Sequence, residues 1–493
     1  MLQDGEATPA RNGPRSEVMD NLAGSLDQAG ADLVTVTHFA VALLVTGHVL
    51  LTKRDIGASI GWIGIAWLSP FIGGLFYLTF GINRVVRRAR RLRPGPPGSL
   101  ARAWLASYQR REDHLGPLDR AAHRLTRRPA EQGNAVALLL QGDAAYPQML
   151  QAIEAAQASI ALSSYILRAD SAGNRFIEAL TAAQARGVEV RVLVDGVGSG
   201  YFNSPAFRAL RRNGVPVARF LHSLLPWRMP FLNLRTHKKI LCVDGRIGFT
   251  GGLNIGAENV LAGQPRHPVR DAHFQLEGPV VAQLVETFAE DWQFVTGEEL
   301  DGPGWFPGLT PVGDVTARVV TSGPDRDVEK IEMLVLQAVG CARHNVAIMT
   351  PYFLPDDRLV TALALAAMRG VEVDIVLPER SNHPVMDWAV GAEIGPLLQA
   401  GCRIWRNPPP FEHSKLMTID GVWCLIGSTN WDTRSFRLNF ELNVEIYDPA
   451  LATKLEQLMA EKRSRRFAEK EVAQRPLPIR LRDAGARLLL PYL

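Results

Sequence analysis

The sequence of 493 residues is poor in cysteine. It contains four, and no two of them have the Cys-x-x-Cys spacing: Cys242, Cys341, Cys402 and Cys424. This pattern argues against a disulfide framework and against a zinc site built on cysteine pairs. It is typical of a protein whose folded part lies in a reducing compartment.

An excess of charge of one sign is also missing, because 54 basic residues are balanced by 50 acidic residues. A protein that binds nucleic acid usually concentrates its basic residues on one face. Here the dense basic cluster directly follows an apolar segment: Arg84, Arg87, Arg88, Arg90, Arg91 and Arg93. The sequence therefore favours anionic membrane lipids as partners and predicts no nucleic-acid partner. It contains no indication of oligomeric state.

Two apolar runs lie near the N-terminus, at residues 33–51 and 60–82. As a helix, each run is about 30 Å long, which is enough to cross a bilayer. We predict a two-span transmembrane hairpin over residues 33–82, preceded by a disordered segment over residues 1–32. A buried helical hairpin in a soluble domain is the alternative, and a cleaved signal peptide is disfavoured because the first run starts late.

The basic cluster predicts the orientation of this hairpin, because positive charge beside a membrane span stays in the cytoplasm. Two spans then leave both termini, and everything after residue 84, on the cytoplasmic side. Residues 83–135 are predicted to form a basic linker, and residues 466–493 a C-terminal tail.

From residue 136 onward, short apolar runs alternate with amphipathic segments, which is typical of an α/β fold. In the first half we expect strands at 136–140, 159–167, 188–194 and 215–220, and helices at 143–157, 174–186 and 205–213. In the second half we expect strands at 345–352, 371–377 and 402–405, and helices at 328–341, 356–369 and 386–400.

The two halves also share sequence. Arg-Gly-Val-Glu-Val occurs at residues 186–190 and again at 369–373, each time between a predicted helix and a predicted strand. An internal duplication explains this repeat, with domains at residues 136–312 and 313–465. Duplicated domains bring two equivalent sites together across a pseudo-two-fold interface, so we expect one shared active site.

A short motif occurs once in each half, with the spacing His-x-Lys-x4-Asp: His237, Lys239 and Asp244, then His413, Lys415 and Asp420. Similar residues follow both copies at the same distance: Gly251, Gly252 and Asn254, then Gly427, Ser428 and Asn430. Two copies with one downstream pattern argue against coincidence.

The motif has the chemistry of a phosphate site. We expect a β-hairpin with an Asp-Gly turn, in which His237 and Lys239 point to one face. An ammonium neutralises phosphate oxygens, and an imidazole attacks phosphorus or transfers a proton. Three side chains are expected to donate to the phosphate oxygens: Asn254, Asn430 and Ser428. Gly252 is expected to let the backbone approach closely.

Asp244 has a different expected role, because seven residues of strand place it about 23 Å from His237 and on the opposite face. Asp244 and Asp420 are therefore expected to hold the hairpin turns. Another carboxylate must orient each imidazole, as the acid of a catalytic triad does. The candidates follow the motifs, and we favour Asp271 and Glu441 over Glu445, with ordinary surface carboxylates as the alternative.

These residues resemble the phospholipase D superfamily, whose signature is the paired His-x-Lys-x4-Asp motif, over about residues 136–465. Four further features make the whole chain resemble the bacterial cardiolipin synthases: the two N-terminal spans, GPVV at residues 278–281, NWDTRSFRLNFELNVE at residues 430–445, and the C-terminal Pro-Tyr-Leu. The resemblance implies an α/β fold, with two duplicated phospholipase D-like α/β/α sandwich domains that share one active site after two transmembrane helices. It also implies a place in the bacterial inner membrane, with the catalytic domains facing the cytoplasm.

The resemblance further implies a reaction. One His attacks a phosphatidylglycerol to form a phosphohistidine, and the other His protonates the leaving glycerol. That second His then activates a hydroxyl of another phosphatidylglycerol, which gives cardiolipin. No metal or cofactor is implied, because Lys and Asn carry the charge. We slightly favour His237 as the nucleophile.

Three alternatives remain from the sequence. A phospholipase D hydrolase would use water as the acceptor, and a nuclease of the same fold would want a long basic groove with stacking aromatic residues. A non-catalytic membrane scaffold is disfavoured by the two intact motifs.

Two apolar segments are candidates for lipid contact. Residues 221–234, LHSLLPWRMPFLNL, directly precede the first motif, and we predict an interfacial flap there, with a buried core loop as the alternative. Residues 475–493 alternate basic and apolar residues, and are expected either to lie on the membrane or to pack as an ordinary tail.

Overall fold

The computed structural model describes residues 14–52, 56–78, 111–222, 234–325 and 327–488. The chain divides into two compact units, residues 1–84 and 85–493, and each is considered by itself. The predicted flap at residues 221–234 lies outside the described residues, except for its first two residues and its last. The basic cluster that ends at Arg93 also lies outside them.

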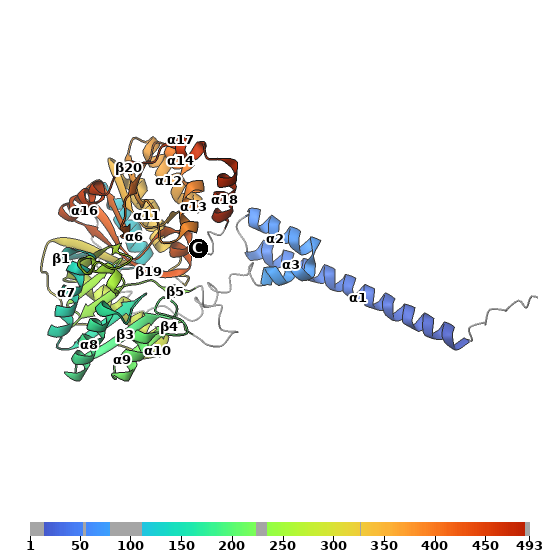
Figure 1. Ribbon diagram of the computed structural model, residues 1–493, viewed down its shortest axis with the longest axis horizontal. Helices are drawn as coiled ribbons and strands as arrows, with labels where there is room; N and C mark the ends of the chain where they lie inside the picture. Colours follow the sequence, from blue (N-terminus) through green and yellow to red (C-terminus); the bar gives the residue numbers. More distant parts are fainter. Residues whose placement is uncertain (1–13, 53–55, 79–110, 223–233, 326, 489–493) are drawn as a thin grey trace, which may run out of the picture. The chain divides into compact units, whose positions relative to one another are not determined.

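The described residues of the first unit form three helices: α1 (Pro14–Thr52), α2 (Ile56–Leu68) and α3 (Pro70–Phe76) (Figure 1). One stretch of α1, Gln28–Thr52, is long and apolar enough to cross a membrane. The three helices pack on one another through a small apolar cluster: Val45, Val49, Ala66 and Tyr77. Most other large apolar side chains of this unit are exposed, as expected for helices that face lipid.

Two predictions for this unit differ from the structure. The helix α1 begins at Pro14, so residues 14–32 are helical and not disordered. Proline is favoured in the first helical turn, because backbone N–H groups there have no acceptor within the helix and the lack of one costs no hydrogen bond. The second apolar run is not one continuous helix, because α2 ends before Ser69 and Pro70 starts α3. Residues 79–82 of the predicted second span lie outside the described residues.

The second unit is built on one sheet, in which each half contributes a matching set of strands. The order within the first half is β1 (Glu131–Leu140), β9 (Ala272–Glu277), β7 (Ile247–Gly251), β6 (Ile240–Val243), β2 (Ser159–Ser164), β3 (Glu189–Asp195) and β4 (Val217–Phe220). The order within the second half is β10 (Val315–Ser322), β19 (Asn439–Tyr447), β17 (Trp423–Gly427), β16 (Leu416–Ile419), β11 (Asn345–Met349), β13 (Glu372–Pro378), β14 (Arg403–Asn407) and β20 (Arg465–Arg466). The halves join where β1 pairs antiparallel with β10.

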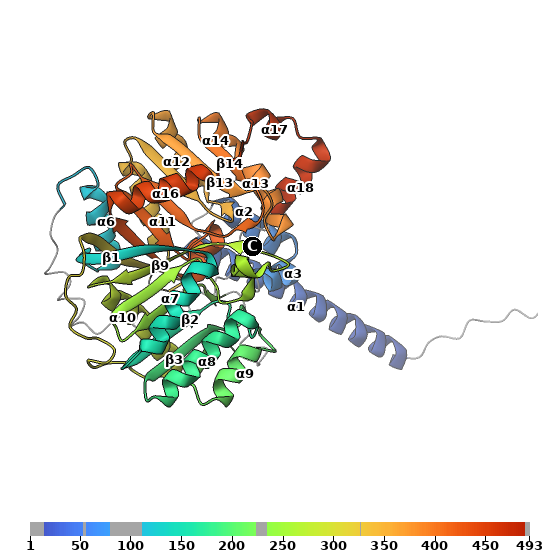
Figure 2. The same ribbon diagram turned by 60° about the vertical axis from the view of Figure 1, so that its left-hand side comes forward.

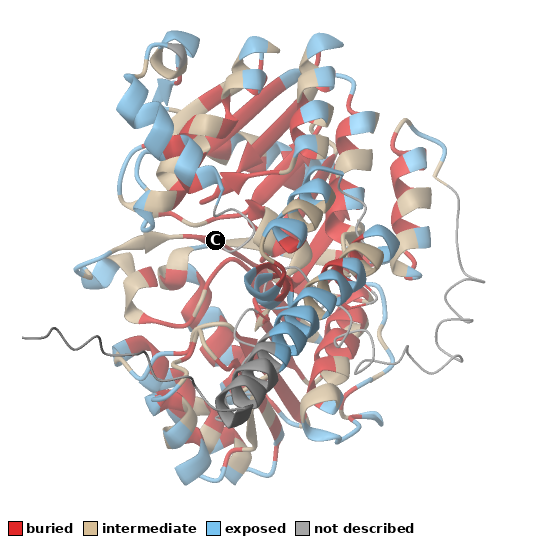
Figure 3. Ribbon diagram, turned by 90° about the vertical axis from the view of Figure 1, so that its right-hand side faces the viewer, coloured by how far each residue is buried: buried red, intermediate tan, exposed pale blue. Residues whose placement is uncertain are grey.

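Helices cover both faces of this sheet (Figures 1 and 2). One face carries α7 (Gln141–Ala155), α8 (Ser171–Ala185) and α9 (Pro205–Arg212) in the first half, and α11 (Lys330–Cys341), α12 (Asp357–Met368) and α14 (Gly395–Gln399) in the second. The other face carries α10 (Val280–Thr296) and α16 (Pro449–Glu461), which share one apolar core across both halves. The strands between these layers are buried (Figure 3). This arrangement confirms the predicted duplicated α/β/α sandwich.

The predicted linker at residues 83–135 is folded over its described part. Helix α6 (Gly116–Thr126) packs Leu115, Leu118 and Ala122 into the core of the second half, and β1 starts at Glu131. Asp119 on α6 forms an ion pair with Arg318 of β10, whose side chain is fully buried. The segment therefore belongs to the catalytic unit, because a buried arginine needs a partner that this segment supplies.

The C-terminal segment also packs as part of this unit. Helix α13 (Pro384–Glu393) contacts α18 (Leu477–Arg487), which follows α17 (Glu469–Ala473). Arg487 pairs with Glu393 at 3.0 Å, and Asp483 of α18 is buried and accepts from Arg475. One helix predicted at residues 386–400 is divided into α13 and α14, since Pro396 starts a new helix.

Removing the carboxylate of Asp119 should destabilise the catalytic unit. Arg318 would keep Glu445 at 3.2 Å but would lose its second charged partner in a fully buried position. We expect Asp119→Ala to lower the free energy of unfolding by about 3 kcal/mol, measured by thermal denaturation in detergent. Glu372→Ala, which removes an exposed partner of Arg403, should cost less than about 1 kcal/mol. Equal losses would contradict this assignment.

Candidate active site

Each motif lies at the start of a β-hairpin. The turns are Asp244-Gly245 and Asp420-Gly421, and all four residues have φ between 52° and 64°. A two-residue turn with positive φ at both positions matches the twist of the paired strands and favours Asp-Gly. His237 and Lys239 lie just before β6, and Lys238 between them points away to pair with Asp291 of α10 at 2.7 Å.

The motif aspartates hold the hairpins in place. The carboxylate of Asp244 accepts the backbone N–H groups of Gln157, Ala158 and Ser159, at 2.7–3.1 Å. Asp420 binds the backbone of Arg343, His344 and Asn345 in the same way, and also accepts from Nε2 of His114 at 2.9 Å. Each aspartate thus ties its hairpin to the preceding helix–strand connection, and the motif imidazoles of His237 and His413 are bound by other carboxylates.

Each half holds the motif of the other half. The short strand β5 (Arg235–Thr236) pairs in parallel with β19, and β15 (Phe411–Glu412) pairs in parallel with β8 (Val269–Arg270). The backbone N–H of His237 then donates to the carbonyl of Phe440 at 2.8 Å, and that of His413 to Arg270 at 2.7 Å. The two imidazoles are consequently positioned by strands that cross between the halves.

The carboxylate partners of the imidazoles are crossed as well. Nδ1 of His237 donates to Oε2 of Glu441 at 3.0 Å, and Nδ1 of His413 donates to Oδ2 of Asp271 at 2.7 Å. Both carboxylates are fully buried. Glu445, the third candidate, instead lies 3.2 Å from Arg318. A carboxylate in this position fixes the tautomer, so that Nε2 of each imidazole is left free to react.

Ser428 and Gly252 serve these carboxylates rather than the phosphate. Ser428 is buried and its hydroxyl donates to Oε2 of Glu441 at 2.5 Å, which corrects the predicted role as a phosphate donor. Asn439 donates to the other oxygen of Glu441 at 3.1 Å. A Cβ at Gly252 would lie 2.0 Å from Oδ1 of Asp271. Glycine is needed there because the carboxylate, not a ligand, occupies the space.

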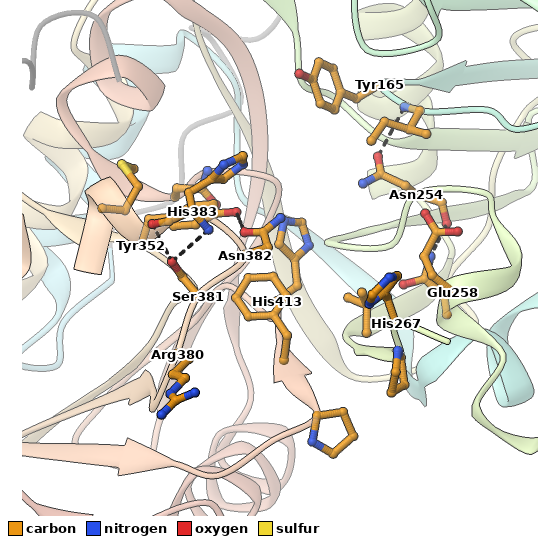
Figure 4. Close-up of a pocket in the computed structure, with 18 of the residues that line it drawn as sticks. Tyr165, Asn254, Glu258, His267, Tyr352, Arg380, Ser381, Asn382, His383 and His413 are labelled. Atoms are coloured by element: carbon orange, nitrogen blue, oxygen red, sulfur yellow. Dashed lines mark hydrogen bonds between the residues drawn. The ribbon is translucent and has the colours of Figure 1, made fainter. Parts of the chain in front are cut away.

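Both imidazoles line one cavity of about 1350 Å³. Asn254 and Asn430, the other predicted donors, line it too, and Figure 4 shows Asn254 and His413 at this cavity. The side-chain oxygen of Asn254 accepts the backbone N–H of Ile166 at 3.3 Å, so the NH₂ group of the same amide points away from Ile166. Oδ1 of Asn430 has no hydrogen-bond partner among the described residues.

Each motif lysine contacts the histidine that stands two residues before it. Nζ of Lys239 donates to the carbonyl of His237 at 2.7 Å, and Nζ of Lys415 lies 2.9 Å from Nδ1 of His413. Aromatic rings cover the same imidazoles: the ring of Tyr165 stands edge-on to His237 at 4.9 Å, and that of Tyr352 to His413 at 6.5 Å. The motif spacing does not reveal these tyrosines, which follow the strands β2 and β11.

Burial changes the protonation of this site. It lowers the pKa of His413 to about 4 and that of His237 well below its ordinary value, with Lys239 and Lys415 adding to the effect. Burial also lowers the pKa of Lys239 to about 7 and that of Lys415 to about 8. Both imidazoles are therefore neutral at pH 7, and a neutral imidazole has the lone pair that nucleophilic attack requires.

The two carboxylates differ in charge. Burial raises the pKa of Glu441 to about 7. For Asp271 burial acts in the same direction, but the charges of Lys415 and His413 outweigh it and leave the pKa below the ordinary value. The half-sites are thus chemically unequal. Among the described residues, no group of three His, Cys, Asp or Glu side chains is arranged to hold a metal ion.

Comparison with known proteins agrees with this geometry. The family described as cardiolipin synthase, PLD-like domain, matches residues 149–292 and 335–463. The major cardiolipin synthase of Bacillus subtilis is 32% identical over 483 residues, which cover 94% of this chain and 98% of that protein. Cardiolipin synthase A of Pseudomonas fluorescens is 33% identical over 473 residues, with the same two coverages.

The fold also occurs among solved structures. The phosphatidylserine synthase of Haemophilus influenzae superposes with a TM-score of 0.55 at 14% identity, and covers 76% of this chain and all of that one. The family match, the two full-length relatives and the paired motifs in one cavity lead to one conclusion: this chain belongs to the cardiolipin synthase family of phospholipase D-like enzymes.

Proposed function

We propose that this enzyme transfers a phosphatidyl group from one phosphatidylglycerol to another, and releases cardiolipin and glycerol. One observation carries the proposal: His237 and His413 come from opposite halves, line the same cavity and each have a buried carboxylate on Nδ1. Two imidazoles with free Nε2 atoms supply a nucleophile and a proton donor to one phosphodiester.

In the first step, Nε2 of one imidazole attacks the phosphorus of phosphatidylglycerol. A P–N bond forms, the P–O bond to the glycerol headgroup breaks, and the second imidazole donates a proton to the leaving oxygen. The ammonium groups of Lys239 and Lys415, with the amides of Asn254 and Asn430, offset the charge on the phosphate oxygens. Burial disfavours the protonated forms of the lysines and of the imidazoles in the empty site. The bound anionic substrate favours these protonated forms.

In the second step, the second imidazole takes a proton from the terminal hydroxyl of another phosphatidylglycerol. That oxygen attacks phosphorus, the P–N bond breaks, and the first imidazole is restored. The carboxylates of Asp271 and Glu441 hold both rings and stabilise the imidazolium form. Asp244 and Asp420 contribute by fixing the hairpins that carry the motifs.

The proposed substrates are membrane lipids, so the first unit is proposed to anchor the enzyme. The stretch Gln28–Thr52 crosses the bilayer once, and α2 with α3 returns as a second, broken span. Membrane helices tolerate proline where neighbouring helices satisfy the freed backbone groups. The basic cluster ending at Arg93 then keeps the catalytic unit in the cytoplasm, in a multi-pass topology.

Product analysis tests the reaction directly. Detergent-solubilised protein given labelled phosphatidylglycerol should form cardiolipin and free glycerol, and His237→Ala or His413→Ala should reduce synthesis at least about a thousandfold. Both variants should remain folded and membrane-bound. Phosphatidic acid as the sole lipid product would mean that water is the acceptor. Substantial synthesis by either variant would rule out the shared site.

Adding one methyl group at Gly252 should disable the enzyme without unfolding it. The new Cβ of Gly252→Ala would displace Asp271 and leave His413 without its carboxylate, so we expect activity to fall at least about a hundredfold. Ser428→Ala, the matched change in the other half, removes one hydrogen bond to Glu441, while Asn439 still binds that carboxylate. The activity of Ser428→Ala should fall about tenfold or less. Similar rates for the two variants would contradict these contacts.

The pH dependence should report the lysines. The free enzyme needs protonated Lys239 and Lys415 to bind the phosphate, and their pKa values lie at about 7 and about 8. The ratio kcat/KM should therefore fall as the pH rises through 7 to 8, since this ratio reports ionisations of the free enzyme. The fall of kcat with rising pH should occur at a higher pH than the fall of kcat/KM, because the bound anion stabilises the ammonium groups. A kcat/KM that stays constant from pH 6 to pH 9 would argue against this role.

A further inference from the structure

The duplication brings matched positions to the two ends of the cavity, but the residues there do not match. Two residues before each motif histidine stand Arg235 and Phe411, and both line the cavity. Four residues after each motif asparagine stand Arg434 and Glu258, which also line it. Two of these matched positions therefore carry arginine, and their duplicated counterparts carry phenylalanine and glutamate.

The two arginines act on each other. Both side chains line the same cavity, where burial lowers the pKa of Arg434 and the charge of Arg235 lowers it further. Both also act on Tyr165, whose ring stands edge-on to His237. Nη1 of Arg235 is buried and has no hydrogen-bond partner among the described residues. A buried guanidinium nitrogen without a partner is costly unless a ligand supplies an acceptor.

Two buried carboxylates, Asp195 and Asp432, face the same region, and both already bind backbone N–H groups. Burial raises the pKa of Asp195 and that of Asp432 to about 6. The oxygens of Asp195 accept three backbone N–H groups, including that of Thr236 at 2.8 Å. Asp432 caps α15 (Thr433–Arg437) by accepting from the backbone of Ser435 at 2.6 Å. The carboxylates are thus engaged in holding the backbone that carries the two arginines.

We infer that Arg235 and Arg434 form a second phosphate subsite, which binds the phosphodiester of the acceptor lipid while its glycerol hydroxyl enters the catalytic centre. This inference rests on the proposed function and deepens it. A paired guanidinium site suits a phosphodiester because each fork donates two parallel hydrogen bonds.

The acceptor phosphate fits this site better than the transferred phosphate does. The transferred group already has two lysines and two asparagines around it: Lys239, Lys415, Asn254 and Asn430. In cardiolipin the two phosphates are joined through a single glycerol, so the second phosphate must bind within one glycerol of the reacting phosphorus. Arg235 meets this requirement, because it is two residues from His237 and lines the same cavity. An acceptor without a phosphate has nothing to place there.

A competition between two acceptors tests the subsite. The detergent-solubilised full chain is given phosphatidylglycerol together with 1-butanol, so that cardiolipin and phosphatidylbutanol form from the same phosphohistidine. For Arg235→Gln and for Arg434→Gln, the ratio of cardiolipin to phosphatidylbutanol should fall at least about tenfold, the loss expected for one charge-assisted hydrogen bond. Formation of phosphatidylbutanol should stay within about twofold of wild type, which also shows that the variants are folded.

Two further variants sharpen the result. Arg235→Lys keeps the charge and should restore part of the ratio. Arg437→Gln is the matched control, because Arg437 lies on the same short helix as Arg434 but pairs with Asp356 at 2.9 Å and does not line the cavity. Its ratio should equal that of the wild-type protein.

Three outcomes would overturn the inference, and they are distinguishable. An equal loss of both products would mean that the arginines act on the transferred phosphate. An unchanged ratio in a chain that makes cardiolipin would mean that neither arginine binds the acceptor, while the proposed function would stand. Wild-type protein that forms phosphatidylbutanol but no cardiolipin would overturn the proposed function, and the subsite with it.

Discussion

The crossed hydrogen bonds from His237 to Glu441 and from His413 to Asp271 are the constraint on which the catalytic unit depends. Each pair joins a side chain of one half to a side chain of the other. A buried carboxylate without a partner is strongly unfavourable. Both pairs would be lost together if the halves separated. The same two hydrogen bonds therefore position the imidazoles and hold the two halves together.

The sheet supplies the geometry for this crossing. The junction of β1 with β10 brings the halves together at the middle of the sheet, and β5 and β15 each add a short strand to the opposite half. These strands end immediately before His237 and His413, so the backbone enters each motif already hydrogen-bonded to the partner half. Asp244 and Asp420, at the far ends of the hairpins, complete the support, because each ties its turn to the backbone of a helix–strand connection.

The sequence predicts the architecture and the meeting of His237 and His413 in one cavity, because both follow from local spacing and the repeat. The distance along a strand separates Asp244 from His237, and the parity of the strand places Lys239 beside His237. The spacing does not show which histidine each carboxylate binds. Asp271 and Glu441 follow their motifs at similar distances, so each could pair with the histidine of its own half or with that of the other half. The sequence predicts that Ser428 donates to the phosphate, but a hydroxyl suits a carboxylate equally well, and packing places it on Glu441.

The errors near the N-terminus have a similar origin. Hydropathy indicates that residues 60–82 are apolar, but it does not indicate where a helix breaks. Pro70 begins a new helix directly after the previous one ends. The segment around α6 looks like a linker because it is basic and contains proline. Its membership of the core depends on Arg318, which lies 199 residues away from Asp119.

The covalent link between the halves has a consequence for how such a site can diverge. Two identical subunits related by a two-fold axis would present the same residue at both ends of a shared cavity, so any gain at one end would be imposed on the other. A single chain is free of that restriction. Arg235 and Phe411 occupy matched positions, as do Arg434 and Glu258, yet each pair differs in charge or polarity. Fusion thus allows a symmetric scaffold to distinguish two molecules of the same lipid by the part each plays in the reaction.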